Sequence, residues 1–286
     1  MSAGASGHPP SAIELDRRAY RRRQTTRSVL TGLVSTLVLA TALVLGLGAT
    51  PGWERVRETF LDPDVAWEAL PRVLDGLWLN VRVLAVASVG VLLLALVIAT
   101  LRTLRGAVFF PVRALAAGYT DLFRGTPLII VLYVIGFGVP GLELFGRMDA
   151  AFWGTVALIL TYSAYVAEVF RAGIEAVHPS QRLAARSLGL THGQALRRVV
   201  LPQAVRKVAP ALMNDFVAMQ KDVGLISVLG AVDAVRAAQI ETARHYDFTP
   251  YVVAGLLFVL LALPMIRLTD WYSARLRARE QTGSLV

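Results

Sequence analysis

Six apolar stretches alternate with polar segments along the chain. They span residues 29–49, 77–101, about 114–138, 152–171, 208–230 and 250–269. Each stretch is long enough to cross the roughly 30 Å hydrocarbon core of a bilayer as an α-helix. Because backbone groups in lipid must find hydrogen-bond partners within their own segment, these stretches are expected to be helices. The pattern therefore predicts an all-α fold, a polytopic membrane helix bundle with about six transmembrane helices.

The third stretch has its own irregularity. Residues 106–140 are too long for one simple helix, and they contain Pro111 and the sequence Arg124-Gly125-Thr126-Pro127. A helix break at membrane depth survives only where protein or a water-filled cavity satisfies the freed backbone groups. We therefore expect a cytoplasmic-side helical piece followed by a kinked span.

Basic residues are distributed unevenly between the connecting segments. Those on one side contain 20 Lys and Arg, and those on the other side contain six. The first group comprises residues 1–28, 102–113, 172–207 with Arg171, and 267–286. The second group comprises residues 50–76, 139–151 and 231–249. Because Lys and Arg accumulate on the cytoplasmic side, both termini and the long segment 172–207 are expected in the cytoplasm of a cell whose plasma or inner membrane holds the chain.

The ends of the chain are expected to differ from its middle. Residues 1–28 are rich in Ser, Gly, Pro and Arg, which predicts a disordered basic tail that binds anionic lipid. Residues 29–71 would form an extra N-terminal transmembrane helix and an outer loop, and residues 271–286 a second cytoplasmic tail. A cleavable signal peptide is the alternative for the first span, but the apolar run is long and no clear small-x-small site follows it.

Charge and cysteine content narrow the function classes. A net charge of +9 is compatible with nucleic-acid binding, but the basic residues cluster between apolar runs, so no nucleic-acid partner is expected. The absence of cysteine excludes disulfides. Neither lysine, Lys207 or Lys221, follows a glycine, so the sequence has no phosphate-binding loop, and no metal-ligand spacing occurs. We expect no cofactor, no metal and no enzymatic activity.

Two short helices joined by a turn are predicted inside the segment 172–207. Ser180 is the expected N-cap of the first helix, and Gly189 can adopt the left-handed conformation that ends it. Thr191 and Gln194 form a capping-box pattern at the start of the second helix. An amphipathic loop that lies on lipid headgroups is the alternative interpretation.

The spacing in this segment carries a family resemblance. Three residues separate Leu183-Ala184-Ala185 from Gly189, and nine more residues separate Gly189 from Val199-Val200-Leu201-Pro202. This pattern resembles the cytoplasmic loop of importer permeases in the ATP-binding-cassette superfamily. The family has Glu at Leu183 and usually Gly at Ser180. The resemblance implies that a set of residues in this loop contacts a cytoplasmic ATPase: Gln181, Ala184, Ala185, Leu188, Gly189, Leu201 and Pro202. Pro202 would stop the second helix or begin the next one.

Three further motifs resemble the polar amino-acid branch of these permeases. They are Arg124-Gly125-Thr126-Pro127-Leu128, the run from Ala164 to Glu168, and Lys221-Asp222-Val223-Gly224-Leu225. The resemblance covers roughly residues 72–270 and implies a type I importer permease domain for polar amino acids, with glutamate or a related solute as a candidate. It also implies a second permease subunit, the same or related, a dimer of cytoplasmic ATPases and an extracytoplasmic solute-binding protein.

Candidates for the solute path are polar residues within or beside the spans. They are Arg124, Tyr162, Glu168, Asn214, Lys221 and Asp222. A charge deep in a span is costly unless it faces the bundle interior or water, so such residues indicate a wet path. A purely structural role is the alternative for these residues. Glu168, for instance, can pair with Arg171 three residues later on the same helical face.

Two other classes of protein stay open at this point. An ion-coupled secondary carrier would use the membrane carboxylates as coupling sites, although no inverted repeat is visible by eye. A membrane enzyme or assembly scaffold is the third class, and no catalytic set of residues supports it. Within the permease class, another small solute remains an alternative to amino acids.

Overall fold

The computed structural model describes residues 11–104 and 106–283, and all regular secondary structure within these ranges is helical. The expected all-α fold is therefore confirmed. The chain divides into two units at residues 58 and 59, which are described separately.

The N-terminal unit consists mainly of α1, Ala12–Gly48. Its first turn is capped by Ser11, whose side chain accepts a hydrogen bond from the Glu14 amide. The expected disordered tail is thus helical from Ala12 onward, and residues 1–10 of that tail lie outside the described residues. Residues 24–48 form a candidate span. A short helix, α2 (Trp53–Phe60), follows.

Helix α3, Pro63–Thr103, opens the second unit and is much longer than the expected span. The Asp62 side chain caps it by accepting hydrogen bonds from the amides of Asp64 and Val65, and Pro63 occupies the first turn, where its missing N–H costs nothing. Residues 63–76, which were expected in an outer loop, therefore form the first turns of this helix.

The predicted break in the third stretch is present. A 3₁₀ turn at Ala107–Phe109 leads into α4, Phe110–Gly125, and α5, Leu128–Tyr133, follows after the break. A π-helical turn, Val134–Gly138, and a 3₁₀ turn, Pro140–Leu142, continue α5. The helix direction bends by 109° between the two arms. The bend coincides with Pro127, which disfavours the helical conformation at Thr126.

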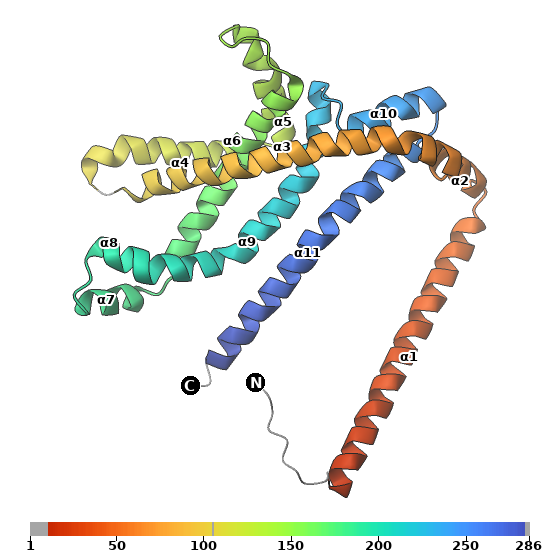
Figure 1. Ribbon diagram of the computed structural model, residues 1–286, viewed down its shortest axis with the longest axis horizontal. Coiled ribbons are helices and arrows are strands. Elements are labelled where there is room, and N and C mark those ends of the chain that lie inside the picture. Colours follow the sequence, from red (N-terminus) through yellow and green to blue (C-terminus); the bar gives the residue numbers. More distant parts are fainter. Residues whose placement is uncertain (1–10, 105, 284–286) are drawn as a thin grey trace. The chain divides into compact units, whose positions relative to one another are not determined.

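The remaining helices complete the bundle around α6, Ala150–Glu175. They are α7 (Pro179–Ser187), α8 (His192–Ala195), α9 (Leu201–Asp222) with a 3₁₀ extension to Leu229, α10 (Ala234–His245) and α11 (Thr249–Gly283). Helix α6 crosses α3 and also packs against α4, α5 and α9 (Figure 1). Residues 271–283, expected as a cytoplasmic tail, belong to α11.

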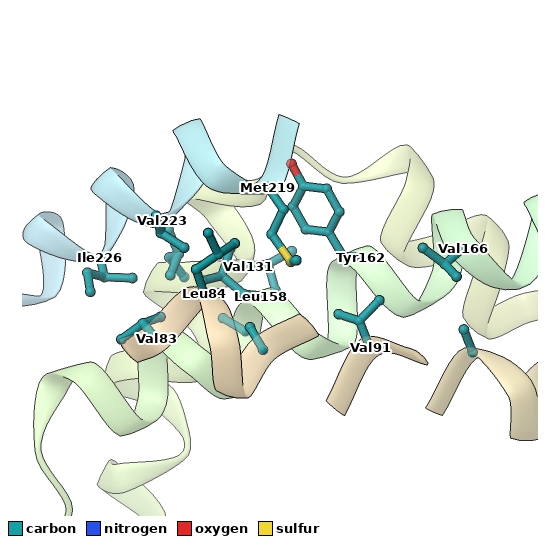
Figure 2. Packing of buried hydrophobic residues seen from close by; sticks show 14 of the residues in the cluster. Val83, Leu84, Val91, Val131, Leu158, Tyr162, Val166, Met219, Val223 and Ile226 are labelled. Carbon is teal, nitrogen blue, oxygen red and sulfur yellow. The ribbon is translucent and has the colours of Figure 1, made fainter. Parts of the chain in front are cut away.

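Apolar packing between α3, α6 and the α9 region forms the main core. Leu84, Leu158, Met219 and Ile226 are all buried there, and Figure 2 shows how the side chains of this cluster lie against one another. Tyr162 belongs to the same cluster, although its hydroxyl group is polar. Within the described residues, four helices are long and apolar enough to span a membrane, or six if each bent pair counts as one span. The larger of these two counts agrees with the expected number of about six transmembrane helices.

A buried polar cluster joins α3, the 3₁₀ segment after α9 and α10. The Asn80 amide group donates to Asp233 Oδ2 at 2.9 Å and to the Val223 carbonyl at 3.2 Å, and it accepts from the Ala234 amide at 3.0 Å. Both Asn80 and Asp233 are completely buried. Asp233 also caps α10 through the Arg236 amide. One side chain of α3 thus fixes the start of α10 and the start of the 3₁₀ segment after α9.

We expect Asn80→Ala to lower the free energy of unfolding by roughly 3 kcal/mol, because it leaves a buried carboxylate and a buried amide without their partner. The measurement is unfolding of the purified protein in mixed micelles. Asn214→Ala is the matched control, since Asn214 is exposed on α9 and its loss should change stability by less than about 0.5 kcal/mol. Equal effects of the two variants would contradict a structural role for Asn80.

Candidate functional site

The motif in the segment 172–207 folds as a helical hairpin, α7 followed by α8, which lie side by side (Figure 1). The N-cap of α7 is His178 and not Ser180 as expected: the His178 ring nitrogen accepts from the Ser180 amide. Pro179 explains the difference. Proline favours the first helical position, so the N-cap is the residue directly before Pro179. The hairpin otherwise starts where the sequence predicted.

The turn between the two helices has the predicted geometry. Gly189 has a φ of 82°, and its amide donates to the Arg186 carbonyl at 2.9 Å. The Leu190 amide reaches the Ala185 carbonyl at 3.2 Å, which satisfies carbonyl groups that the end of α7 leaves free. Thr191 and Gln194 make both hydrogen bonds of the capping box, at 2.9 and 3.3 Å.

The second helix is not a separate short element, in contrast to the expectation. Helix α8 passes through a π-helical turn, Leu196–Val200, directly into α9. Pro202 lies in the first turn of α9, so it begins this helix and does not stop the preceding one. Proline cannot donate to the carbonyl four residues back, and the wider π-helical turn accommodates this missing hydrogen bond.

Most of the residues assigned to ATPase contact are accessible. Gln181, Ala184, Leu188, Gly189, Leu201 and Pro202 are exposed. Ala185 is the exception, because it is buried where α7 faces the rest of the hairpin. Leu183 is 66% exposed, and Leu188 is 83% exposed. The hairpin therefore presents two large apolar side chains to the surface.

Several contacts attach the hairpin rigidly to the bundle. Val177, Val200 and Ala204 form a small buried cluster beneath it. Lys207 Nζ donates to the Ala176 carbonyl at 2.7 Å, which joins α9 to the end of α6. Contact between the two helices is so close that a Cβ on Gly173 would lie 2.0 Å from Val208 Cγ1. The hairpin is thus packed against the ends of both α6 and α9.

A cleft of about 480 Å³ opens between the α4–α5 break, α6 and α9. It is lined by Arg124, Gly125, Thr126, Pro127, Leu128, Thr161, Tyr162, Tyr165, Asp215, Ala218 and Asp222. The Tyr162 hydroxyl donates to Asp222 Oδ2 at 2.7 Å. The Arg124 guanidinium lies 6.0 Å from the centre of the Tyr165 ring, and the Tyr165 hydroxyl donates to the Arg124 carbonyl.

Two polar atoms of this cleft are buried without a partner among the described residues. They are Thr161 Oγ1 and Asp215 Oδ2. Thr161 is only 3% exposed, so water in bulk does not replace the missing hydrogen bond. An unpartnered carboxylate oxygen in such a place is costly, because burying it loses hydration that nothing replaces. The cleft is therefore suited to a ligand that carries a positively charged group or a hydrogen-bond donor.

The structure brings together half of the path residues that the sequence suggested. Arg124, Tyr162 and Asp222 line the cleft, whereas Asn214 and Lys221 are exposed on a different face of α9. Asp215, one of the polar residues of the 208–230 stretch, and Thr161 were not among these six candidates. Asp215 could have been found by spacing, since it lies seven residues before Asp222 and thus on the same helical face.

Glu168, the sixth candidate, lies in an ion-pair network outside the cleft. Its predicted partner Arg171 is confirmed, and Arg171 also bonds to Glu175 at 2.6 Å. Arg102 of α3 adds a second cation, with 2.8 Å to Glu168 and 3.1 Å to the buried hydroxyl of Thr120. Glu168 thus ties α3, α4 and α6 together.

Metal binding has no support in the part of the chain that the structure describes, where no three His, Cys, Asp or Glu side chains are placed to hold an ion.

Comparison with known proteins gives consistent similarities. The family described as "Binding-protein-dependent transport system inner membrane component" matches residues 92–278. The arginine transport system permease protein ArtQ of Bacillus subtilis (strain 168) is 34% identical over 205 residues, which are 71% of this chain and 91% of that protein. The probable glutamine ABC transporter permease protein GlnM of the same organism is 31% identical over 206 residues, 72% of this chain and 93% of that protein.

A solved structure shows the same fold. The crystal structure of an amino acid ABC transporter with histidines contains a chain that is 34% identical and superimposes with a TM-score of 0.69. The superposition covers 75% of this chain and 99% of that chain.

Proposed function

This chain belongs to the family of inner membrane components of binding-protein-dependent transport systems, and from that premise we propose how its cleft and its hairpin carry an amino acid across the membrane. It is the permease subunit of an ATP-binding-cassette importer, so ATP is hydrolysed on a separate subunit and a binding protein delivers the solute. The observation that carries the proposal is that the family match covers both the cleft and the hairpin in one chain.

Amino acids are the proposed solute class. The relatives are named for arginine and glutamine, which differ in their side chains but share an α-ammonium and an α-carboxylate group. Recognition of these shared groups needs one negative and one positive partner. The cleft contains an unpartnered carboxylate oxygen at Asp215 and a guanidinium at Arg124. We assign the ammonium group of the solute to Asp215 and its carboxylate to Arg124.

The proposed role of the hairpin is to couple this cleft to ATP. Closure of an ATPase dimer would move the exposed residues of the hairpin, and the contacts at Gly173 and Lys207 would pass that movement to α6 and α9. Both helices line the cleft. ATP thus biases a two-state bundle between its outward-open and inward-open forms.

The topology and the full assembly belong to the same proposal. The excess of Lys and Arg supports a cytoplasmic position for both termini and the hairpin. Asn214 and Lys221 are exposed on α9, which suits a face that meets a second permease subunit, the same or related. Surrounding lipid would cover the exposed apolar helix faces.

Reconstitution into vesicles tests the proposal directly. We expect uptake of a labelled amino acid only when the permease, its ATPase, the binding protein and ATP are all present. Uptake driven by an ion gradient without ATPase would identify a secondary carrier, and no uptake under any condition would favour a scaffold.

Gly189→Pro is expected to abolish ATP-driven uptake while the protein still inserts into the membrane. Proline fixes φ near −65°, whereas Gly189 requires 82° and donates its amide to Arg186. Gly189→Ala keeps the amide and should reduce uptake less, since a left-handed alanine costs about 1–2 kcal/mol. Charge reversal at Arg197 and Arg198 should also impair coupling. Unchanged uptake by the proline variant would show that the hairpin does not couple the two subunits.

A further inference from the structure

The hairpin and the first half of α9 carry charge of only one sign. Residues 176–214 contain no Asp or Glu. They contain six basic residues: Arg182, Arg186, Arg197, Arg198, Arg206 and Lys207. Such a surface is repelled by a basic partner and attracted by an acidic one.

A pocket of about 190 Å³ lies within this basic region, between α7 and the π-helical turn. It is lined by Thr103, Ile174, Arg182, Arg186, Ala195, Leu196 and Val200. We call it the arginine socket. Its two charged groups, Arg182 and Arg186, have no carboxylate beside them in the described part of the chain, and its other walls are mainly apolar.

Arg182 is held in place by one hydrogen bond, but another N–H group of its guanidinium is unpaired within the described ranges. Its Nη2 donates to the Ile174 carbonyl at 2.7 Å, while its Nε is buried and has no acceptor among the described residues. A guanidinium offers five N–H donors in a fixed plane that matches a carboxylate. The socket therefore has the chemistry to accept a carboxylate.

Apolar side chains flank the socket on the same helix. Leu183 of α7 and Leu188, the residue that caps the end of this helix, are mostly exposed. In this chain the hairpin consequently offers cations and leucines at its surface, and no anion.

We propose that the arginine socket binds an Asp or Glu side chain on the surface of the ATPase subunit, with Leu183 and Leu188 packing on apolar residues beside it. This inference rests on the proposed function of the hairpin and adds the chemistry of the partner. The permease supplies the positive half of the ion pair, and the ATPase supplies the negative half. A carboxylate in the socket bonds to Arg182 and Arg186 together.

An anionic lipid headgroup has the same charge but fits the socket less well. Arg182 is fixed to the Ile174 carbonyl and cannot extend to follow a membrane surface. The socket also lies in the hairpin whose exposed residues are assigned to ATPase contact. A protein carboxylate is therefore the favoured occupant.

The test measures the affinity of the detergent-purified permease for its own ATPase subunit, at several NaCl concentrations. Arg186→Glu should weaken binding at least about tenfold, because it places a carboxylate opposite another one. Arg206→Glu is the matched control: it makes the same change in charge, and Arg206 is exposed on α9 outside the socket. Its effect should be below about threefold and should fade with salt, as for a screened surface charge.

Further variants keep the result interpretable. Arg182→Lys retains the charge but loses the planar fork, so it should weaken binding less than Arg186→Glu does. An Asp→Arg or Glu→Arg substitution on the ATPase that restores binding to Arg186→Glu would identify the paired carboxylate. Equal losses for Arg186→Glu and Arg206→Glu would overturn the proposal.

Two other outcomes have distinct meanings. If the Arg186→Glu permease binds the ATPase like the unaltered protein but binds less to vesicles containing 30% phosphatidylserine, the socket serves lipid and the proposal is wrong. If the unaltered permease does not bind the ATPase at all, the proposed function itself fails, irrespective of the socket.

Discussion

Asp215→Asn is expected to reduce ATP-driven amino-acid uptake about 30-fold or more, since loss of one partner of a buried charge pair costs roughly 2–5 kcal/mol. Asp215 Oδ2 lies buried in the cleft without a partner among the described residues. In the proposed path it meets the ammonium group of the solute, which asparagine cannot neutralise. The measurement is the initial uptake rate of the reconstituted importer with saturating binding protein.

A second readout separates this role from a structural one. Because Asp215 Oδ2 has no partner among the described residues, Asp215→Asn should leave the free energy of unfolding unchanged or raise it. Asp270→Asn is the control, since Asp270 is exposed on α11 and should alter neither uptake nor stability. A destabilised Asp215→Asn variant would indicate that the carboxylate holds the fold and not the solute.

Glu168→Gln is expected to destabilise the bundle by roughly 3 kcal/mol, because it leaves two partly buried arginines without their shared carboxylate. Arg102 and Glu168 have side-chain exposures of 18% and 21%, so solvent screens this pair only in part. This loss in the free energy of unfolding is near the lower end of the range expected when one partner of a fully buried ion pair is removed. Unfolding in mixed micelles measures it.

Glu175→Gln is a close control for this variant. Glu175 contacts the same Arg171, but its side chain is 61% exposed. Exposed ion pairs contribute about 0–1 kcal/mol, so this change should be nearly silent. If Glu168→Gln and Glu175→Gln lower the free energy of unfolding equally, burial does not explain the importance of Glu168.

Local features of the coupling hairpin were predictable from the sequence. The conformation of Gly189 and the capping box of Thr191 and Gln194 depend on residues within four positions of one another. The error at Ser180 was also local: Pro179 prefers the first helical position, which moves the cap to His178. The continuation of α8 into α9 was not predicted, because a π-helical turn accommodates Pro202 and the capping signals of the sequence do not indicate such a turn.

Contacts between distant segments were less predictable. Spacing identified Arg171 as a partner of Glu168, but Arg102 lies 66 positions away and only the packing of α3 on α6 brings it there. Likewise, helical periodicity separates Asp222 from its neighbour Lys221, yet it does not say which face meets the cleft. For this reason the solute-path candidates on α9 include both exposed residues and a residue that lines the cleft.

The unbroken course of α6 has a further consequence. Its middle contributes Thr161 and Tyr162 to the cleft, and its last turn supports the hairpin at Ile174. These places are about 20 Å apart at the rise of an α-helix, with no kink between them to take up slack. In the proposed mechanism the solute acts at the middle of α6 and the ATPase at its last turn, so binding at one place would be transmitted to the other through a single continuous helix.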